Sequence, residues 1–197
     1  MKKSGFVFQC VMSLAVFMAV HTSSYAKELA GVSLKDQIMV QGIDSPLKLN
    51  GAGIRYKFFF KIYVGALYLP KKQADAATVL KSSQPNRIVM HFIYDDVPKK
   101  KLVDAWLEGF ENNNNKAAFD AVKSRLYEFN DMFSGVKKDD VVLLDYFPGK
   151  GTRVSIKGVE KGVIEGRDFN RALLSVWLGE EPVTEELKDA MLGIEED

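Results

Sequence analysis

One charged side chain, Arg55, lies at the entrance of a segment that is otherwise mostly apolar and aromatic. The segment, LNGAGIRYKFFFKIYVGALYLP, covers residues 49–70, and Arg55 follows a Gly-Ala-Gly-Ile sequence. A guanidinium is permanently charged and weakly hydrated, and it can hold a carboxylate or phenolate through two parallel hydrogen bonds. Arg55 is therefore a candidate anion-binding residue. From the residues alone, a solvated arginine paired with an acid is the ordinary alternative, because most arginines are exposed.

The residues that most enzymes use for covalent or metal chemistry are scarce. Cys10 is the only cysteine and lies within the first 26 residues, and His91 is the only histidine after them. Zinc sites are built mostly from Cys and His, and a Ser-His or Cys-His nucleophile would have to be built around His91 alone. No G-x-S-x-G, P-loop or G-x-G-x-x-G motif introduces a strand–helix unit. We therefore expect no metal and no cofactor, and we interpret His91 as a core or edge histidine.

The first 26 residues have the layout of a secretory signal peptide. Lys2 and Lys3 give a cationic start, residues 6–20 are mostly apolar, and Ser24 and Ala26 are small residues that fit a cleavage site after Ala26. The apolar run is short for a bilayer span, and an uncleaved N-terminal anchor is the alternative. We predict export to the periplasm, a mature domain over residues 27–197, and no stable membrane span after cleavage.

The charge of the mature chain argues against nucleic acid as a partner. Cleavage removes two of the 27 Lys and Arg residues and none of the 26 Asp and Glu residues, which leaves a net charge of −1. Nucleic-acid-binding proteins usually show a marked basic excess. The length of the mature chain fits one domain with a sizeable core.

The elements that must position Arg55 are predicted from hydrophobic periodicity and turn residues. Strands are expected over 33–42, over 54–69 as one long strand or two, and over 87–94, 140–148, 152–158 and 161–166, with a turn region at 45–53. Helices are expected over 98–114, 116–133, 167–179 and 184–193, with a helical turn or two within 70–83. Runs of strands and runs of helices in this order predict an α+β domain with helices on one face of an antiparallel sheet.

Several of these stretches resemble one known family. GAGIR (51–55) precedes a strand that ends in YVGALYL, YFPGKGTRVSIKG (146–158) reads as a hairpin, and GVIEGRDFNRALLSVWLGEEPVTEELKDAMLG (162–193) closes the chain. Together they resemble the chalcone isomerase family, and most of all its exported bacterial chalcone isomerase-like members, over essentially the whole mature chain. The resemblance implies an open-faced β-sandwich, in which helices cover a large antiparallel sheet and leave a ligand cleft between. That family contains plant isomerases that close a flavonoid ring and non-catalytic relatives, some of which bind fatty acids.

The resemblance also implies roles for individual residues. Arg55 matches the family's arginine that holds an anionic or carbonyl oxygen of the ligand, and Tyr63 matches a polar strand residue that is threonine in the plant enzymes. Tyr63 follows Arg55 by eight residues, so strict alternation puts both on one face, but a core tyrosine with a satisfied hydroxyl is the alternative. The plant enzymes' tyrosine and asparagine fall at Lys101 and Glu108, which do not preserve their chemistry. Tyr94 is a candidate substitute for the missing hydroxyl.

We therefore expect an exported, non-catalytic protein that binds a fatty acid or a similar amphipathic anion. The alternatives are an intramolecular lyase of the chalcone isomerase type, with Arg55 and Tyr63 as catalytic residues, and a structural or interaction module whose cleft is closed. Lys99 and Lys100, together with Lys101, could attract an acid headgroup or form a solvated helix start. The sequence leaves the oligomeric state open. The expected ligand-binding residues are Arg55, Tyr63, Tyr94 and Lys101, with Phe58 and Phe60, or else Phe59, lining the cleft.

Overall fold

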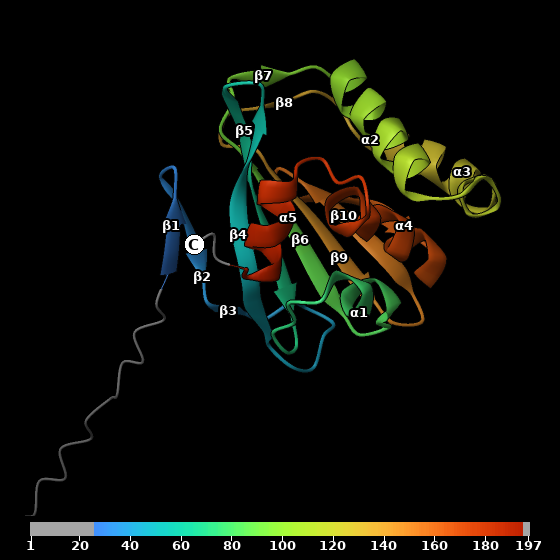
Figure 1. The fold of residues 1–197 in the computed structure, drawn as a ribbon, viewed down its shortest axis with the longest axis horizontal. Helices are drawn as coiled ribbons and strands as arrows, with labels where there is room; N and C mark the ends of the chain where they lie inside the picture. Colours follow the sequence, from blue (N-terminus) through green and yellow to red (C-terminus); the bar gives the residue numbers. More distant parts are fainter. Residues whose placement is uncertain (1–25, 195–197) are drawn as a thin grey trace, which may run out of the picture.

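The fold is built on a seven-stranded antiparallel sheet, seen in a computed structural model that describes residues 26–194. The predicted signal peptide lies outside the described residues except for Ala26, which begins the first strand. Within the described part the sheet has the order β11-β10-β9-β6-β5-β4-β3 (Figure 1). The strands are β1 (Ala26–Leu29), β2 (Val32–Lys35), β3 (Gln37–Ile38), β4 (Leu47–Lys57), β5 (Phe60–Leu69), β6 (Asn86–Phe92), β7 (Asp96–Val97), β8 (Val136–Lys137), β9 (Val141–Phe147), β10 (Gly151–Ile156) and β11 (Val159–Ile164). The helices are α1 (Ala76–Lys81), α2 (Lys99–Asn113), α3 (Lys116–Asp131), α4 (Arg167–Leu178) and α5 (Glu185–Leu192).

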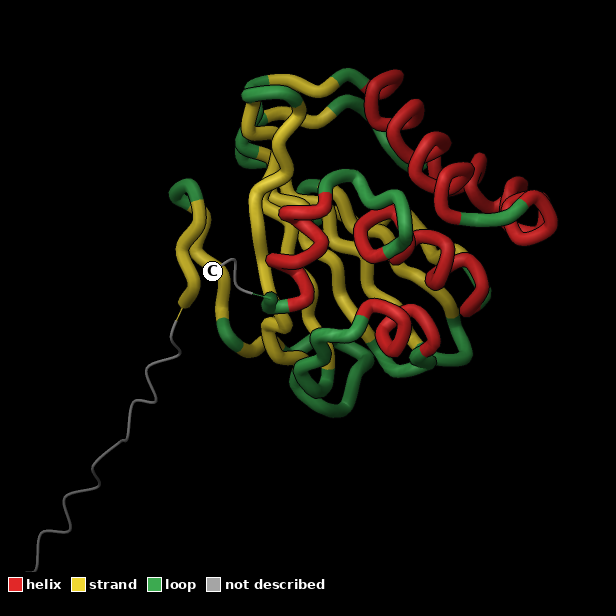
Figure 2. Tube along the Cα trace, viewed as in Figure 1, coloured by secondary structure: helices red, strands yellow, loops and turns green. Residues whose placement is uncertain are grey.

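The two faces of the sheet carry different covers. On one face, buried residues of β5, β6, β9 and β10 pack against the helices and form the larger core. On the other face, a smaller core forms under the separate β1–β2 hairpin, with Val32 and Leu34 among its members. In Figure 2 the helices lie on one side of the sheet and the β1–β2 hairpin on the other. The predicted α+β architecture, an open-faced β-sandwich covered by helices, is confirmed.

The long strand predicted over 54–69 is the second half of β4 followed by β5. The two strands turn at Phe58 and Phe59, with Lys57 opposite Phe60. The turn region predicted over 45–53 is wrong from Leu47 onward, because β4 already begins there.

The expected first strand over 33–42 is also divided, and its two parts pair with different strands. Residues of β2 pair with β1, whereas β3 pairs with β4. Asp36 separates them, and its carbonyl accepts a hydrogen bond from the Leu49 N–H at 2.8 Å.

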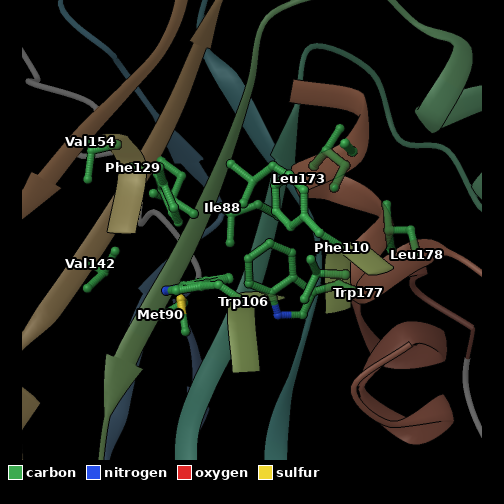
Figure 3. Packing of buried hydrophobic residues seen from close by; sticks show 14 of the residues in the cluster. Ile88, Met90, Trp106, Phe110, Phe129, Val142, Val154, Leu173, Trp177 and Leu178 are labelled. Carbon is green, nitrogen blue, oxygen red and sulfur yellow. The ribbon is translucent and has the colours of Figure 1, made fainter. Parts of the chain in front are cut away.

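The helix layer is held by aromatic side chains at helical spacing. Trp106 of α2 and Trp177 of α4 were predicted to be core residues, and both are buried, with ring centroids 5.6 Å apart in an edge-to-face arrangement (Figure 3). The polar break between α2 and α3 has a structural role, because the Asn115 side chain accepts a hydrogen bond from the Ala118 N–H and begins α3. The helices therefore form a packed layer, and the candidate site lies at one end of it.

Candidate functional site

A cavity of about 300 Å³ opens between the ends of β4, β5 and β6 and the start of α2. Its walls are mainly apolar and continue the core beneath the helices, with Met90, Phe92, Leu102 and Val176 among the buried lining residues. This volume lies at the lower end of the roughly 300–1,000 Å³ that small-molecule sites span. The cavity can therefore hold a small, mostly apolar molecule.

Arg55 and Tyr63 line this cavity side by side. They are directly opposite each other in the β4–β5 pairing, and the register shifts immediately after Arg55. Their common face therefore comes from cross-strand pairing through a hairpin rather than from alternation along one strand. Arg55 is half-buried, and among the described residues its guanidinium has neither an ion pair nor a hydrogen bond. Its charge and its donors are available to a ligand.

Tyr63 presents a hydroxyl that is protonated at neutral pH. The side chain is 6% exposed, and its oxygen accepts a hydrogen bond from the Trp177 Nε1–H at 2.9 Å. Burial raises the pKa of Tyr63 to about 12, although the Trp177 hydrogen bond and the charge of Arg55 both favour the phenolate. Within residues 26–194 no hydrogen bond donated by this hydroxyl is found. Tyr63 can therefore donate a hydrogen bond to a ligand oxygen beside Arg55, but it is a poor general base.

Only one of the three consecutive lysines at the start of α2 lines the cavity, and it is Lys101. The Lys99 Nζ lies 3.7 Å from the Asp131 Oδ1. The Lys100 Nζ forms an ion pair with the Asp104 Oδ2, one helical turn away, at 2.8 Å.

Lys57 from the end of β4 adds a third cation to the cavity lining, and Asp96 is the one carboxylate among the described residues that line it. The cavity lining therefore has an excess of positive charge, which suits an anionic group.

Aromatic side chains from the β4–β5 hairpin form part of the cavity wall. Phe58 and Phe60 line the cavity and Phe59 is not among the described lining residues, so the structure agrees with the first of the two arrangements expected from the sequence. Tyr94 also lines the cavity and meets Phe60 edge to face, with ring centroids 5.6 Å apart. All four predicted ligand-binding residues thus border one cavity, and their role in binding stays a prediction.

Two tryptophans belong to the site although the sequence indicated only a core role for them. Trp106 lines the cavity, and its Nε1 is buried without a hydrogen-bond partner among the described residues. Trp177 orients the Tyr63 hydroxyl from a position 114 residues further along the chain. Glu108, at the position of the plant enzymes' asparagine, is exposed on α2 and is not among the described lining residues.

Outside the cavity, the described residues offer little other chemistry. His91 is half-buried and lies 3.8 Å from Asp139, and it is not one of the described residues that line the cavity. Among the described residues no three or more His, Cys, Asp or Glu side chains gather closely enough to hold a metal ion. No helix in that part of the chain is both long and apolar enough to cross a bilayer. The buried carboxylate of Asp145 pairs with Arg87 and Arg153, which joins β9 to the strands on either side.

The fold and the cavity together define an α+β protein with an open-faced β-sandwich and a small-molecule cavity under the helices. The chain belongs to the chalcone isomerase-like family, because the profile of that family matches residues 26–193.

A similar solved structure is the crystal structure of a fatty-acid binding protein from Arabidopsis thaliana. It superposes with a TM-score of 0.67 over 85% of this chain and 96% of the plant chain, at 17% sequence identity. At this level of identity the likeness establishes the fold alone. No curated protein matches the sequence.

Proposed function

We propose that this protein is exported and, without catalysing a reaction, binds a fatty acid or a similar amphipathic anion in the cavity beside Arg55. The observation that carries the proposal is that Arg55 is half-buried at the border of an apolar cavity, and that its guanidinium has no protein partner among the described residues. A buried or half-buried charge is unfavourable unless an opposite charge or hydrogen bonds compensate it. A ligand carboxylate would supply both.

The two parts of such a ligand would contribute differently. Burial of the acyl chain supplies most of the affinity, at about 0.8 kcal/mol per methylene. Arg55 and the protonated hydroxyl of Tyr63 fix the carboxylate at one end, and Lys57 and Lys101 add a favourable field. The resemblance to a plant fatty-acid binding protein in fold supports the same class of ligand.

The geometry gives less support to the two alternatives. A lyase that closes a flavonoid ring needs a held phenolate and a polarised ketone, but Lys101 replaces the plant tyrosine and Glu108 is exposed. A module with a closed cleft would lack a cavity of about 300 Å³. We therefore favour binding over both.

The test is native mass spectrometry of the protein expressed with its own leader and purified from the exported fraction. We expect a protein that begins at Lys27 and carries a fatty acid. Replacing Arg55 by Ala removes hydrogen bonds to a charged group, worth about 1.5–3 kcal/mol, and so should weaken binding roughly 10- to 150-fold. Arg171→Ala, at an exposed arginine of α4, is the matched control and should leave binding unchanged.

The experiment also separates the alternatives. A parent protein that is purified without a bound ligand and binds no added fatty acid contradicts the proposal. Ring closure of a chalcone by that empty protein would favour the lyase. A protein that neither binds a fatty acid nor closes the ring of a chalcone would favour an interaction module.

A further inference from the structure

We propose that the tip of the β4–β5 hairpin, residues 55–61, docks onto the surface of an anionic phospholipid bilayer. This aromatic tip has the sequence Arg-Tyr-Lys-Phe-Phe-Phe-Lys. The β4–β5 hairpin reaches the upper edge of the molecule in Figure 1, beside β7 and β8. The proposal goes beyond ligand binding in the cavity and does not depend on what the cavity holds.

The tip exposes more apolar surface than the fold requires. Phe58 and Phe59 are 86% and 82% exposed, and Phe60 and Tyr56 beside them are 45% and 40% exposed. Single exposed apolar residues are common, but a contiguous apolar patch marks an interaction site. The Phe59 and Phe60 ring centroids are 4.5 Å apart with the ring planes tilted by 43°, so these two neighbouring side chains form one apolar surface.

The backbone of the turn argues against a folding role for these phenylalanines. Phe58 has a φ of +57°, in the left-handed region that hairpin turns normally fill with Gly, Asn or Asp. A bulky aromatic residue is unfavourable there, and neither Phe58 nor Phe59 gains compensating burial within the protein. These side chains therefore act through something outside the described fold.

The charges around the tip indicate which kind of surface it binds. Arg55, Lys57 and Lys61 lie within seven residues that contain no acid, and none of the three has an ion pair among the described residues. Aromatic rings next to basic residues are typical of segments that lie at the membrane interface, where rings enter the headgroup region and cations meet anionic lipids. A purely apolar protein partner would not need the cations.

The position of the tip relative to the cavity gives docking a consequence. Phe58 and Phe60 are shared between the aromatic tip and the cavity lining, and Lys57 belongs to both as well. A docked tip would therefore bring the mouth of the cavity against the headgroups, where amphipathic molecules enter and leave the bilayer.

The experiment is co-sedimentation of the exported protein with vesicles of phosphatidylcholine alone and of equal parts phosphatidylcholine and phosphatidylglycerol. We expect sedimentation with the anionic vesicles, weaker at high salt because exposed charges are screened. Phe58→Gly with Phe59→Ser should fold at least as well, since glycine suits the turn, yet should bind at least about tenfold more weakly. Lys57→Gln with Lys61→Gln should weaken binding to anionic vesicles roughly thirtyfold, at about 1 kcal/mol per basic residue.

The matched control is Met39→Ser with Val163→Ser, which removes two exposed apolar side chains elsewhere and should change nothing. Thermal unfolding of each variant shows whether it is folded. A parent protein that stays in the supernatant with both kinds of vesicle overturns the proposal. The same holds if the folded Phe58→Gly, Phe59→Ser variant sediments like the parent, or if the tip instead mediates self-association without vesicles.

Discussion

At the scale of single residues, one oxygen atom connects the sheet, the helix layer and the cavity. The Tyr63 hydroxyl accepts a hydrogen bond from the Trp177 Nε1–H, and Tyr63 itself lies opposite Arg55 in the β4–β5 pairing and lines the cavity. Because burial raises the pKa of Tyr63 to about 12, the oxygen keeps its proton at any physiological pH. The residue therefore contributes both to stability and to the polar end of the site.

Replacing Tyr63 by Phe tests its contribution to stability. The change leaves the Trp177 Nε1–H buried without its acceptor, so the free energy of unfolding at pH about 8 should fall by about 1–3 kcal/mol. The pKa is about 12 in the folded state and 10.0 when unperturbed, so the folded state binds more protons between these values. Stability from this group is therefore complete below pH 10 and is lost as the pH rises toward 12, by about 3 kcal/mol in total.

Urea denaturation of the parent and the variant at pH about 8 and at pH about 11.5 checks both expectations. Because Phe does not titrate, the gap in stability between the two proteins should narrow at the higher pH. Tyr127→Phe, at an exposed tyrosine of α3, is the control and should show no such narrowing. A gap that is the same at both pH values would contradict the assigned pKa.

The resemblance to a known family predicted four residues that line the cavity. The side-chain contacts around these residues could not be predicted from the sequence. Lys101 borders the cavity, whereas Lys99 and Lys100 lie beside acids, one of them on the next helix. Three consecutive lysines look alike in sequence, because nothing local shows where Asp131 will lie. The hydrogen bond from Trp177 to Tyr63 is equally invisible, since α4 must first pack on the sheet.

At the scale of elements, the close approach of α5 to β4 explains the Gly-Ala-Gly sequence before Arg55. A Cβ added at Gly51 would lie 2.1 Å from the Ala190 carbonyl oxygen, and one at Gly53 would lie 2.6 Å from the Ala190 Cβ. The Asn50 side chain reinforces this contact by donating to the Met191 carbonyl at 2.8 Å. The glycines thus let the C-terminal helix lie directly on the strand that carries Arg55.

The same close approach of α5 to β4 explains why the turn region predicted over residues 45–53 was wrong. Gly, Asn and Pro together are typical of turns, and the same glycines are found inside strands where another backbone approaches closely. Local composition does not distinguish the two cases, because the second depends on a helix more than 130 residues away in the chain, with α5 beginning at Glu185. In contrast, β6 was predicted well, because its alternation of buried and half-buried residues is local.

A graded set of alanine substitutions tests the contact between α5 and β4. Gly51→Ala should destabilise the protein by about 1–3 kcal/mol or more, because the clash is with backbone, and Gly53→Ala should be the next most harmful. Gly65→Ala is the control, since its added Cβ would lie 3.3 Å from side-chain atoms of Leu187 and Tyr63, which would need to shift much less than the backbone around Gly51. Urea denaturation measures the order, and a Gly51→Ala variant as stable as Gly65→Ala would contradict the close approach.

At the scale of the whole molecule, the cavity continues the larger core. Its buried lining residues come from β5, β6, α2 and α4, and the same residues hold the helix layer to the sheet. A ligand that fills the cavity therefore binds the folded state and not the unfolded chain. Binding should raise the stability of the whole domain, in proportion to the logarithm of ligand concentration over Kd.

A series of straight-chain fatty acids should make this coupling visible in the melting temperature of the purified protein. Each added methylene should tighten binding about fourfold, from about 0.8 kcal/mol of burial, until the cavity of about 300 Å³ is full. At a ligand concentration of 100 times Kd the gain is about 2.7 kcal/mol, or roughly 5–11 °C in Tm for a domain of this size. The Arg55→Ala variant should show the same dependence on chain length, but with a smaller rise in Tm at each length. It loses the contact with the headgroup and keeps the apolar walls. A Tm that does not depend on chain length, or that rises without reaching a plateau, would mean that the acyl chain does not occupy this cavity.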